Sequence, residues 1–263
     1  MPEGDTVWLT AHRLHRALAG RALTDADLRV PALATVDLRG RHVDEVLARG
    51  KHVLIRLDDD LTLHSHLRMD GSWHVSRAGA PPPRRHPDHL IRVLLGNAEW
   101  LATGYRIHDL QLVARADEAR LVGHLGPDLL GPDWDADRAL ANLIDAADVP
   151  IGEALLDQRN LAGIGNLYKC ESLFLAGINP WTRVGEVADL GRLVGIAHRL
   201  LRANRDHPEQ STTGDLGRGR QHWVYGRAGE PCRRCRTPVR QADQGTPPRA
   251  RTTYWCPSCQ PEH

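Results

Sequence analysis

The chain has little lysine, no even set of cysteines and no long apolar run. Of its 34 basic residues, only Lys51 and Lys169 are lysines, so these two primary amines stand out. Five cysteines are an odd number, which argues against a closed set of disulfides and for a reducing compartment. No apolar run approaches the roughly 18 residues that a membrane-spanning helix needs, and the start of the chain is polar. We therefore expect neither a membrane span nor a signal peptide.

The rest of the composition is that of an ordinary globular protein, with 41% hydrophobic and 25% charged residues. A length of 263 residues allows two domains, each with its own core. The net charge of +1 does not by itself indicate a protein that binds nucleic acid. Residues 215–263 differ, because they hold nine arginines against four acidic residues.

Hydrophobic periodicity divides the chain into a strand-rich first part and a helical second part. Residues 4–19 have the spacing of an amphipathic helix that ends at Gly20. About eight strands behind this helix predict a β-sandwich or flattened barrel. The expected strands are 22–30, 42–47, 52–57, 61–67, 72–75, 90–95, 100–103 and 110–114, and the expected later helices are 135–147, 150–156, 166–176 and 186–205.

From these elements we expect an α+β multidomain protein. Its parts would be a β-sandwich domain over 1–115, a linker over 116–132, a helical module over 133–213 and a zinc-binding hairpin over 214–263. The zinc site follows from two Cys-x-x-Cys pairs with twenty residues between them. Two such pairs complete a tetrahedral four-thiolate site that leaves no position open for water, so one structural zinc ion is expected.

The expected zinc ligands are Cys232, Cys235, Cys256 and Cys259. A redox dithiol is the main alternative for these cysteines. Cys170 stands apart on a predicted helix and is interpreted as a small buried side chain.

Two further features suggest an anionic partner. Arg249 and Arg251 lie between the cysteine pairs, where basic side chains on a hairpin can contact phosphates, although a solvated hairpin explains them equally well. A turn over 157–165 contains Gly163 and Gly165 and leads into a helix that starts near Asn166. Free N–H groups and the helix dipole favour a phosphate there.

The chain opens Met-Pro-Glu, so removal of Met1 would expose the secondary amine of Pro2. An α-amine titrates at about 8, against about 10.4 for lysine, and more of it is unprotonated at neutral pH. A secondary amine that attacks a carbonyl-like carbon yields a charged iminium, which acts as an electron sink. Glu3 could serve as its acid or base. Because Met1 would acylate the nitrogen, we expect the active protein to start at Pro2.

Three more motifs complete the pattern: Arg49-Gly50-Lys51, His66-Leu67-Arg68-Met69-Asp70-Gly71, and Tyr225-Gly226-Arg227 ahead of the first cysteine pair. In this order, from end to end, the motifs resemble the formamidopyrimidine-DNA glycosylase/endonuclease VIII family. The resemblance implies a DNA glycosylase with AP lyase activity, built from an N-terminal β-sandwich, a helix–two-turns–helix module and a zinc ribbon. It also implies damaged double-stranded DNA as partner and a monomeric, cytoplasmic, nucleoid-associated enzyme.

The same resemblance implies roles for individual residues. Pro2 would attack C1′ of a damaged nucleotide and expel the base, while Glu3 would protonate the ring oxygen of the sugar. Lys51 matches the lysine that donates a proton during β-elimination. Arg251 matches the arginine of δ-elimination and phosphate contact, and Asn166 matches the phosphate-binding asparagine.

A nucleotide must leave the duplex to reach such a site, and a side chain must fill the gap. Met69 stands where the family places this wedge, with a core methionine as the alternative. Arg106 is its candidate partner, although His108 replaces the aromatic residue expected nearby in the formamidopyrimidine branch.

Two departures from that branch bear on the substrate. Gly152 replaces a lysine, and only residues 207–225 cover the stretch that holds the branch's long loop over an oxidised purine. Both departures favour the endonuclease VIII branch and oxidised pyrimidines, with oxidised purines as the alternative. Strand cleavage by β- or by β,δ-elimination stays open.

Two other classes of protein share parts of this pattern. A non-catalytic protein that binds damaged DNA would keep the scaffold but would not need the catalytic residues. A transcription regulator with a zinc ribbon would bind intact DNA sequence-selectively. His64 and His66 could face one metal ion but are expected to be ordinary side chains, and Arg84 and Arg85 are expected in a solvated loop.

Overall fold

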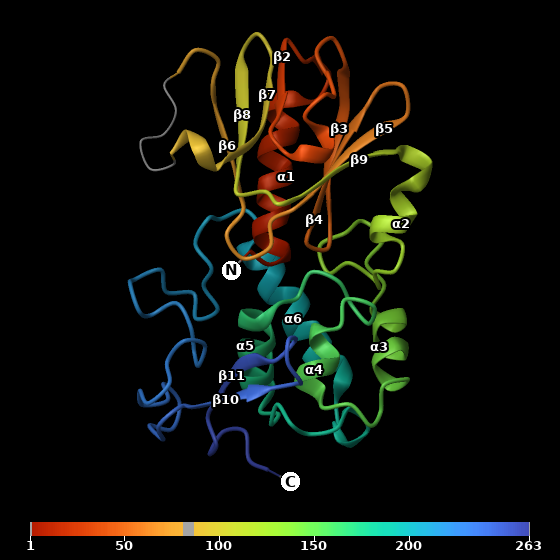
Figure 1. Cartoon of the computed structure of the whole chain (residues 1–263). Helices are drawn as coiled ribbons and strands as arrows, with labels where there is room; N and C mark the ends of the chain where they lie inside the picture. The colour runs from red at the N-terminus through yellow and green to blue at the C-terminus, as the bar shows by residue number, and fades with distance from the viewer. Residues whose placement is uncertain (1, 81–86, 263) are drawn as a thin grey trace. The chain divides into compact units, whose positions relative to one another are not determined.

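The computed structural model describes residues 2–80 and 87–262. Met1 and the segment 81–86, with Arg84 and Arg85, lie outside the described residues, as does His263. The chain divides into two compact units, Met1–His124 and Leu125–His263 (Figure 1).

The N-terminal unit is a β-sandwich with one long helix, as the sequence predicts. Within the described residues, nine strands form two antiparallel sheets, one with the order β1-β3-β4-β5-β9 and the other with the order β2-β7-β8-β6. The elements are α1 (Gly4–Leu18), β1 (Arg21–Ala22), β2 (Asp25–Leu28), η1 (Pro31–Leu33), β3 (His42–Arg49), β4 (His52–Leu57), β5 (Leu61–His66), β6 (Ser72–Arg77), η2 (Asp88–Leu90), β7 (Ile91–Gly96), β8 (Trp100–Tyr105), β9 (Asp109–Ala114), η3 (Arg115–Asp117) and α2 (Glu118–Val122).

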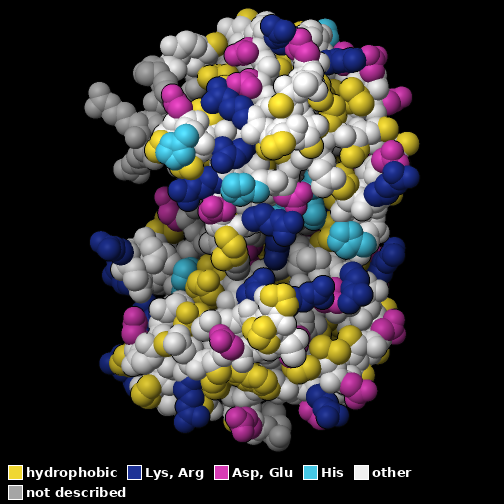
Figure 2. Space-filling model, viewed as in Figure 1, with side chains coloured by type: hydrophobic (Ala, Val, Ile, Leu, Met, Phe, Trp, Pro, Cys, Tyr) yellow, Lys and Arg dark blue, Asp and Glu magenta, His cyan; other side chains and the backbone are white. Residues whose placement is uncertain are grey.

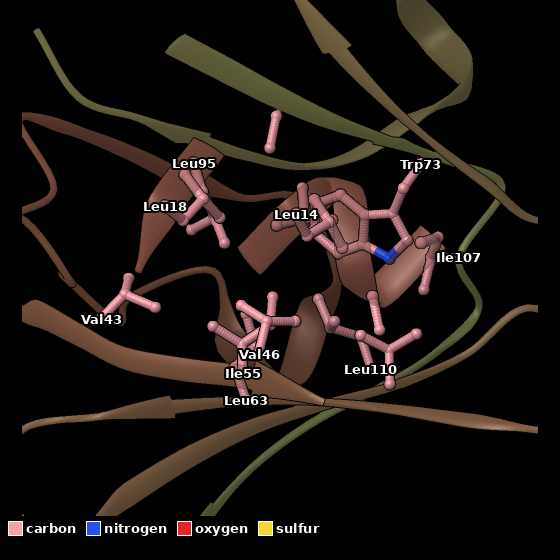
Figure 3. Packing of buried hydrophobic residues seen from close by; sticks show 14 of the residues in the cluster. Leu14, Leu18, Val43, Val46, Ile55, Leu63, Trp73, Leu95, Ile107 and Leu110 are labelled. Atoms are coloured by element: carbon pink, nitrogen blue, oxygen red, sulfur yellow. The ribbon is translucent and has the colours of Figure 1, made fainter. Parts of the chain in front are cut away.

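One hydrophobic core joins α1 to both sheets. Leu14 and Leu18 of α1 are fully buried and pack with Val43 and Ile55 of one sheet and Trp73 of the other (Figure 3). Burial of a leucine side chain contributes about 1.5–3 kcal/mol, so the helix face is a large part of what holds the sandwich together. The polar face of α1 carries its basic residues, which is the amphipathic pattern of the sequence.

The outer face of the five-stranded sheet is covered in part by α2. Buried Glu118 accepts hydrogen bonds from Arg56 at 2.7 and 2.9 Å and from Thr62 at 2.5 Å. The Arg56 guanidinium also bonds Glu45 at 2.6 Å, so one cation ties together β3, β4 and α2. Residues 118–122 are therefore a packed helix rather than an open connection.

The C-terminal unit is a helical module with a β-hairpin. Its elements are α3 (Ala136–Ile144), α4 (Ile151–Leu156), α5 (Asn166–Ala176), η4 (Val184–Glu186), α6 (Leu190–Asn204), β10 (Arg240–Gln244) and β11 (Arg251–Trp255). Helix α5 is buried along most of its length, and its C-cap, Gly177, has a left-handed φ of 77°. A second core surrounds α5, and a third lies between α5 and the cysteine-containing segment.

The expected fold class is thus confirmed: a β-sandwich with an N-terminal helix, then helices, then a four-cysteine hairpin. Among the described residues, none of the helices has the length and apolar character to cross a membrane.

Candidate functional site

One end of the sandwich collects three loops that carry predicted site residues. Strand pairing places Arg49, His52, His66 and Asp109 in a single row across β3, β4, β5 and β9. The turn with Lys51, the loop after β5 and the turn before β9 therefore emerge at the same end of the sheet.

The start of α1 lies at that same end. The other end of the helix is fixed by Gly20 N, which donates to Val43 O at 2.8 Å, and by Val46 N, which donates to His15 Nδ1 at 3.1 Å. The helix and β3 thus run side by side in opposite directions. The first residues of α1 therefore lie near Arg49, at the end of β3. Figure 1 shows the N-terminus at the end of the unit where the β3–β4 turn lies. The structure accordingly brings Pro2, Glu3 and Lys51 to one end of the N-terminal unit.

Pro2 and Glu3 differ in exposure. Pro2 is partly exposed, whereas Glu3, the N-cap of α1, is 0% exposed, and its carbonyl oxygen accepts from Val7 N at 3.0 Å. Asp5, in the first turn of the helix, is buried as well.

Two non-glycine residues at this end have a left-handed backbone. Arg68 has a φ of 55° and Arg106 a φ of 51°, both uncommon for residues with a Cβ. Asp70 and Arg106 form an ion pair at 3.7 Å, which joins the β5–β6 and β8–β9 loops. Between Arg68 and Asp70, Met69 is 66% exposed, so the alternative of a core methionine is wrong. Strained loops with an apolar tip are typical of sites that contact a ligand.

Three imidazoles gather beside the Lys51 turn. His52 Nδ1 and His64 Nε2 are 2.8 Å apart, and the rings of His52 and His66 meet edge-on with centroids 4.8 Å apart. Burial, with help from the neighbouring imidazoles, lowers the pKa of His52 to about 3. Burial followed by the charge of Arg68 lowers the pKa of His66 to about 4. Among the described residues, the cysteine cluster is the only group of three or more candidate ligands close enough together to hold a metal ion.

This cluster predicts a loss of stability in mild acid. The unfolded histidines take up protons below about pH 6.5, while folded His52 and His66 stay neutral to about 3 and 4. The unfolded state then binds more protons, so stability falls as the pH falls through this window. Urea titrations should show a free energy of unfolding lower by about 4 kcal/mol at about pH 4.5 than at about pH 6.5, with about half of the loss coming from each of the two histidines. His52→Gln should flatten this dependence and the exposed control His89→Gln should not; equal slopes in all three proteins would contradict it.

In the C-terminal unit, three polar contacts fasten α5 to β11. They are Asn166 Nδ2 to Thr252 O at 2.7 Å, Lys169 Nζ to Thr253 Oγ1 at 2.6 Å and Tyr254 N to Cys170 Sγ at 3.5 Å. The three helix residues share one face of α5, and their partners are consecutive in β11. Arg251, the residue before Thr252, is therefore held beside the first turn of α5. Asn166 begins that turn, as predicted.

Arginines of the hairpin and of the turn before α5 form a positive edge. Arg249 and Arg251 are both exposed. The hydrogen bond from Arg159, supported by the charge of Arg249, lowers the pKa of Asp157, which places these groups near one another. Elsewhere on the face shown in Figure 2, basic side chains are interspersed with acidic ones. Arg159 was not predicted as a site residue, although its motif was noted.

A buried carboxylate organises the segment ahead of the zinc ribbon. Glu171 of α5 is 0% exposed and accepts from the backbone N–H groups of Trp223, Val224 and Tyr225, each at 2.8 Å, and from the Thr212 hydroxyl. The short stretch 207–225 is thus anchored to α5 at both ends.

The Gln244 side chain packs over Gly152. A Cβ at Gly152 would lie 2.3 Å from Gln244 Oε1, and Gln244 Nε2 is itself held by Pro180 O at 2.7 Å. A lysine at this position would have to displace a buried, bonded glutamine. The departure from the formamidopyrimidine branch is therefore built into the packing of α4 against the hairpin.

The four cysteines predicted as ligands converge in one cluster. Their sulfur atoms all lie within 4.8 Å of one another, with Cys232 and Cys259 at 4.0 Å and Cys235 and Cys256 at 3.4 Å. Tetrahedral zinc with Zn–S bonds of about 2.3 Å places sulfurs about 3.8 Å apart, so the cluster fits the ion. Gln260 fastens the second pair to the end of α5, because it accepts from Cys256 N at 3.0 Å and donates to Ile178 O at 2.8 Å.

Comparison with known families supports the order of these parts. Residues 1–108 match the formamidopyrimidine-DNA glycosylase N-terminal domain, and residues 125–201 match the formamidopyrimidine-DNA glycosylase H2TH domain. The fold is similar to that of Lactococcus lactis formamidopyrimidine-DNA glycosylase in its crystal structure with DNA that contains an AP site. The TM-score is 0.81 at 23% identity, over 99% of this chain and 100% of that chain.

Sequence identity to two relatives is higher than to that solved structure. The chain is 60% identical over 266 residues to the probable endonuclease 8 2 of Streptomyces coelicolor, which covers 99% of this chain and 94% of that protein. It is 48% identical over 260 residues to the DNA-(apurinic or apyrimidinic site) lyase Nei2 of Mycolicibacterium smegmatis, over 99% of both. Since these similarities span nearly the whole of each chain and keep both domains in order, the chain belongs to the formamidopyrimidine-DNA glycosylase/endonuclease VIII family.

Proposed function

We propose that the protein is a DNA glycosylase and AP lyase of base excision repair that acts through the nitrogen of Pro2. The observation that carries this proposal is the meeting of Pro2, Glu3 and Lys51 at one end of the sandwich, next to the exposed Met69. The names of the relatives, an endonuclease 8 and an AP-site lyase, support the same activity.

In the proposed first step, the Pro2 nitrogen forms a bond to C1′ while the bond from C1′ to the base breaks. Glu3, buried at the head of α1, donates a proton to the ring oxygen, so that the sugar opens. The N–H proton of Pro2 passes to the departing base, and the nitrogen lone pair thus restored then forms the C=N bond of an iminium as the ring C1′–O bond breaks. Because proline is a secondary amine, this iminium keeps its positive charge at any pH.

The iminium makes the C2′ proton acidic. Its removal sends the electron pair into the C=N bond, and the 3′ phosphate leaves with the C3′–O electrons, which is β-elimination. We assign Lys51 to proton transfer in this step, since its turn borders the start of α1. Arg251 is assigned to the 5′ phosphate and to a δ-elimination, which would draw on the same iminium and expel that phosphate. Water finally hydrolyses the C=N bond and releases Pro2.

We propose damaged double-stranded DNA as the partner. Met69 would fill the gap left by the flipped nucleotide, with Arg106 beside it, because both stand on strained loops at the same end. Asn166, Arg249 and Arg251 would contact phosphates. The amide nitrogen of Asn166 carries two hydrogens, of which Thr252 O takes one.

We also assign one structural zinc ion to the four cysteines. When bound, it would supply folding energy that the small hairpin cannot obtain from its own core. It takes no part in the chemistry at Pro2, because four thiolates leave no open position on the ion.

Oxidised pyrimidines are the proposed lesions. Two features support them: the packing of Gln244 over Gly152, where a larger side chain would require Gln244 to move, and the anchoring of 207–225 to Glu171. A panel of duplexes with single lesions tests the proposal. We expect excision of oxidised pyrimidines at least about tenfold faster than of oxidised purines. Activity on a bare abasic site alone would refute the glycosylase part, and binding without any cleavage would favour a non-catalytic damage-binding protein.

A further inference from the structure

Lys169 is one of only two lysines, and it is buried without residual exposure as the fourth residue of α5. A buried ammonium has lost its water and is costly unless other groups bond it. Its Nζ donates to Thr253 Oγ1 at 2.6 Å. None of the steps proposed above uses this amine, so its retention in the core requires another explanation.

The contact between Lys169 and Thr253 belongs to a buried network of hydrogen bonds. Thr253 is itself 0% exposed, and its hydroxyl lies 3.2 Å from Gln244 Oε1 and 3.2 Å from Arg251 O. Gln244 in turn donates to Pro180 O at 2.7 Å. This hydrogen-bond network therefore connects α5 to β11, then to β10, and then to the turn that follows α5.

A second branch of the network leads from Thr253 to the backbone of Arg251. The Thr253 hydroxyl faces the Arg251 carbonyl, and the next carbonyl along β11, that of Thr252, accepts from Asn166. The Arg251 side chain itself is exposed, and its guanidinium bonds only backbone oxygens of its own hairpin in the described contacts. The position of that guanidinium is thus set by the backbone of β11 rather than by a partner side chain.

We propose that Lys169 is a positioning residue for Arg251. By holding Thr253, it fixes β11 against α5 so that Arg251 and Asn166 present their N–H groups to the same stretch of DNA backbone. The inference rests on the proposed function, because it takes Arg251 to contact a DNA phosphate. Lys169 itself contacts no phosphate, since its amine is enclosed.

The salt dependence of DNA binding tests this assignment. The probe is a duplex with one tetrahydrofuran abasic analogue, whose affinity is measured by fluorescence anisotropy over a range of KCl concentrations. Each phosphate contact contributes about 0.9 to the slope of log K against log salt. R251Q should lower the slope by about that amount, and K169M should lower it equally although its amine is buried. The double variant should show no further decrease.

Thr253 offers a matched pair of variants if K169M does not fold. T253V removes the hydroxyl that Lys169 bonds and should behave like R251Q, with affinity reduced about fivefold to tenfold at moderate salt. T253S keeps the hydroxyl and should match the wild type. Circular dichroism and zinc content confirm that each variant is folded.

Two results would overturn the assignment. One is a wild-type slope in both K169M and T253V. The other is a further drop in slope when K169M is added to R251Q, which would show that Lys169 acts independently of Arg251. Because the tetrahydrofuran duplex undergoes no chemistry, this test is separate from catalysis. Absence of a borohydride-trapped adduct in the wild type would refute the proposed activity but would leave the slopes informative.

Discussion

Protein whose Pro2 nitrogen is held in an amide should cut a duplex with a single abasic site at least about a thousandfold more slowly than protein that starts at Pro2. An amide nitrogen shares its lone pair with a carbonyl and cannot form the iminium on which elimination depends. Either a retained Met1 or any longer N-terminal extension creates this amide. Single-turnover cleavage rates, with the intact mass of each preparation, measure the effect.

The control is a protein that carries the same extension at its C-terminus instead of its N-terminus. Its N-terminus is processed to Pro2, and it should cut at the untagged rate. The blocked form should still bind the tetrahydrofuran duplex, because α1 and the sandwich core do not depend on the terminal amine. Full cleavage by a preparation whose mass shows Met1 still attached would exclude Pro2 as the nucleophile.

Replacement of a single zinc ligand should have the second large effect. Cys232 and Cys256 are fully buried and pack with Phe174, Val224 and Val239 in the core between α5 and the hairpin. Structural zinc supplies on the order of 10 kcal/mol of folding free energy in small domains. C256S should therefore lose the metal and unfold the hairpin, which carries Arg249 and Arg251. Affinity for the abasic duplex should fall by about a hundredfold.

Cys170→Ala is the matched control for this prediction. Cys170 is buried beside β11 but lies outside the four-sulfur cluster, so one zinc ion per chain and near wild-type affinity are expected. Metal content by mass spectrometry and anisotropy titrations give both quantities. A C256S protein that keeps one zinc ion and wild-type affinity would show that the cluster is not the metal site we assign.

Most helices and strands could be predicted from the sequence, because the residues that start, stop and pattern them are neighbours along the chain. Helix α5 begins and ends as predicted, since a glycine precedes it and Gly177 adopts the left-handed C-cap that stops it. The strand 52–57 also agrees with the structure. Helix α6 was expected from Glu186 but begins at Leu190. Residues 184–186 form a separate 3-10 turn, and Asp189 caps the helix by accepting from Arg192 N at 2.7 Å.

Pairing between strands could not be predicted in the same way. Residues 22–30 were predicted as one strand, yet β1 joins the five-stranded sheet and β2 the four-stranded one. The chain crosses between the sheets there, and the choice of partner depends on β3 and β7. The register that brings the Lys51 turn to the start of α1 likewise exists only in the folded sandwich.

The candidate site shows the same division. Motifs identify Pro2 and the four cysteines, because their chemistry is visible in the residue types and spacing. Glu171 and Lys169 were not predicted, since each matters through partners more than forty residues away. A signal was present, however: two charged residues stand in an otherwise uncharged and mostly apolar helix, and such residues are rarely buried without a specific partner.

Borohydride reduction in the presence of an abasic duplex, followed by peptide mapping, tests the central proposal most directly. Reduction turns an iminium into a stable amine and so marks the nitrogen that attacked C1′. With only two lysines in the chain, the candidate amines are the N-terminus, Lys51 and Lys169. We predict a single adduct on the peptide that begins at Pro2. An adduct on a lysine peptide, or no adduct while strand cleavage continues, would contradict catalysis by the N-terminal proline.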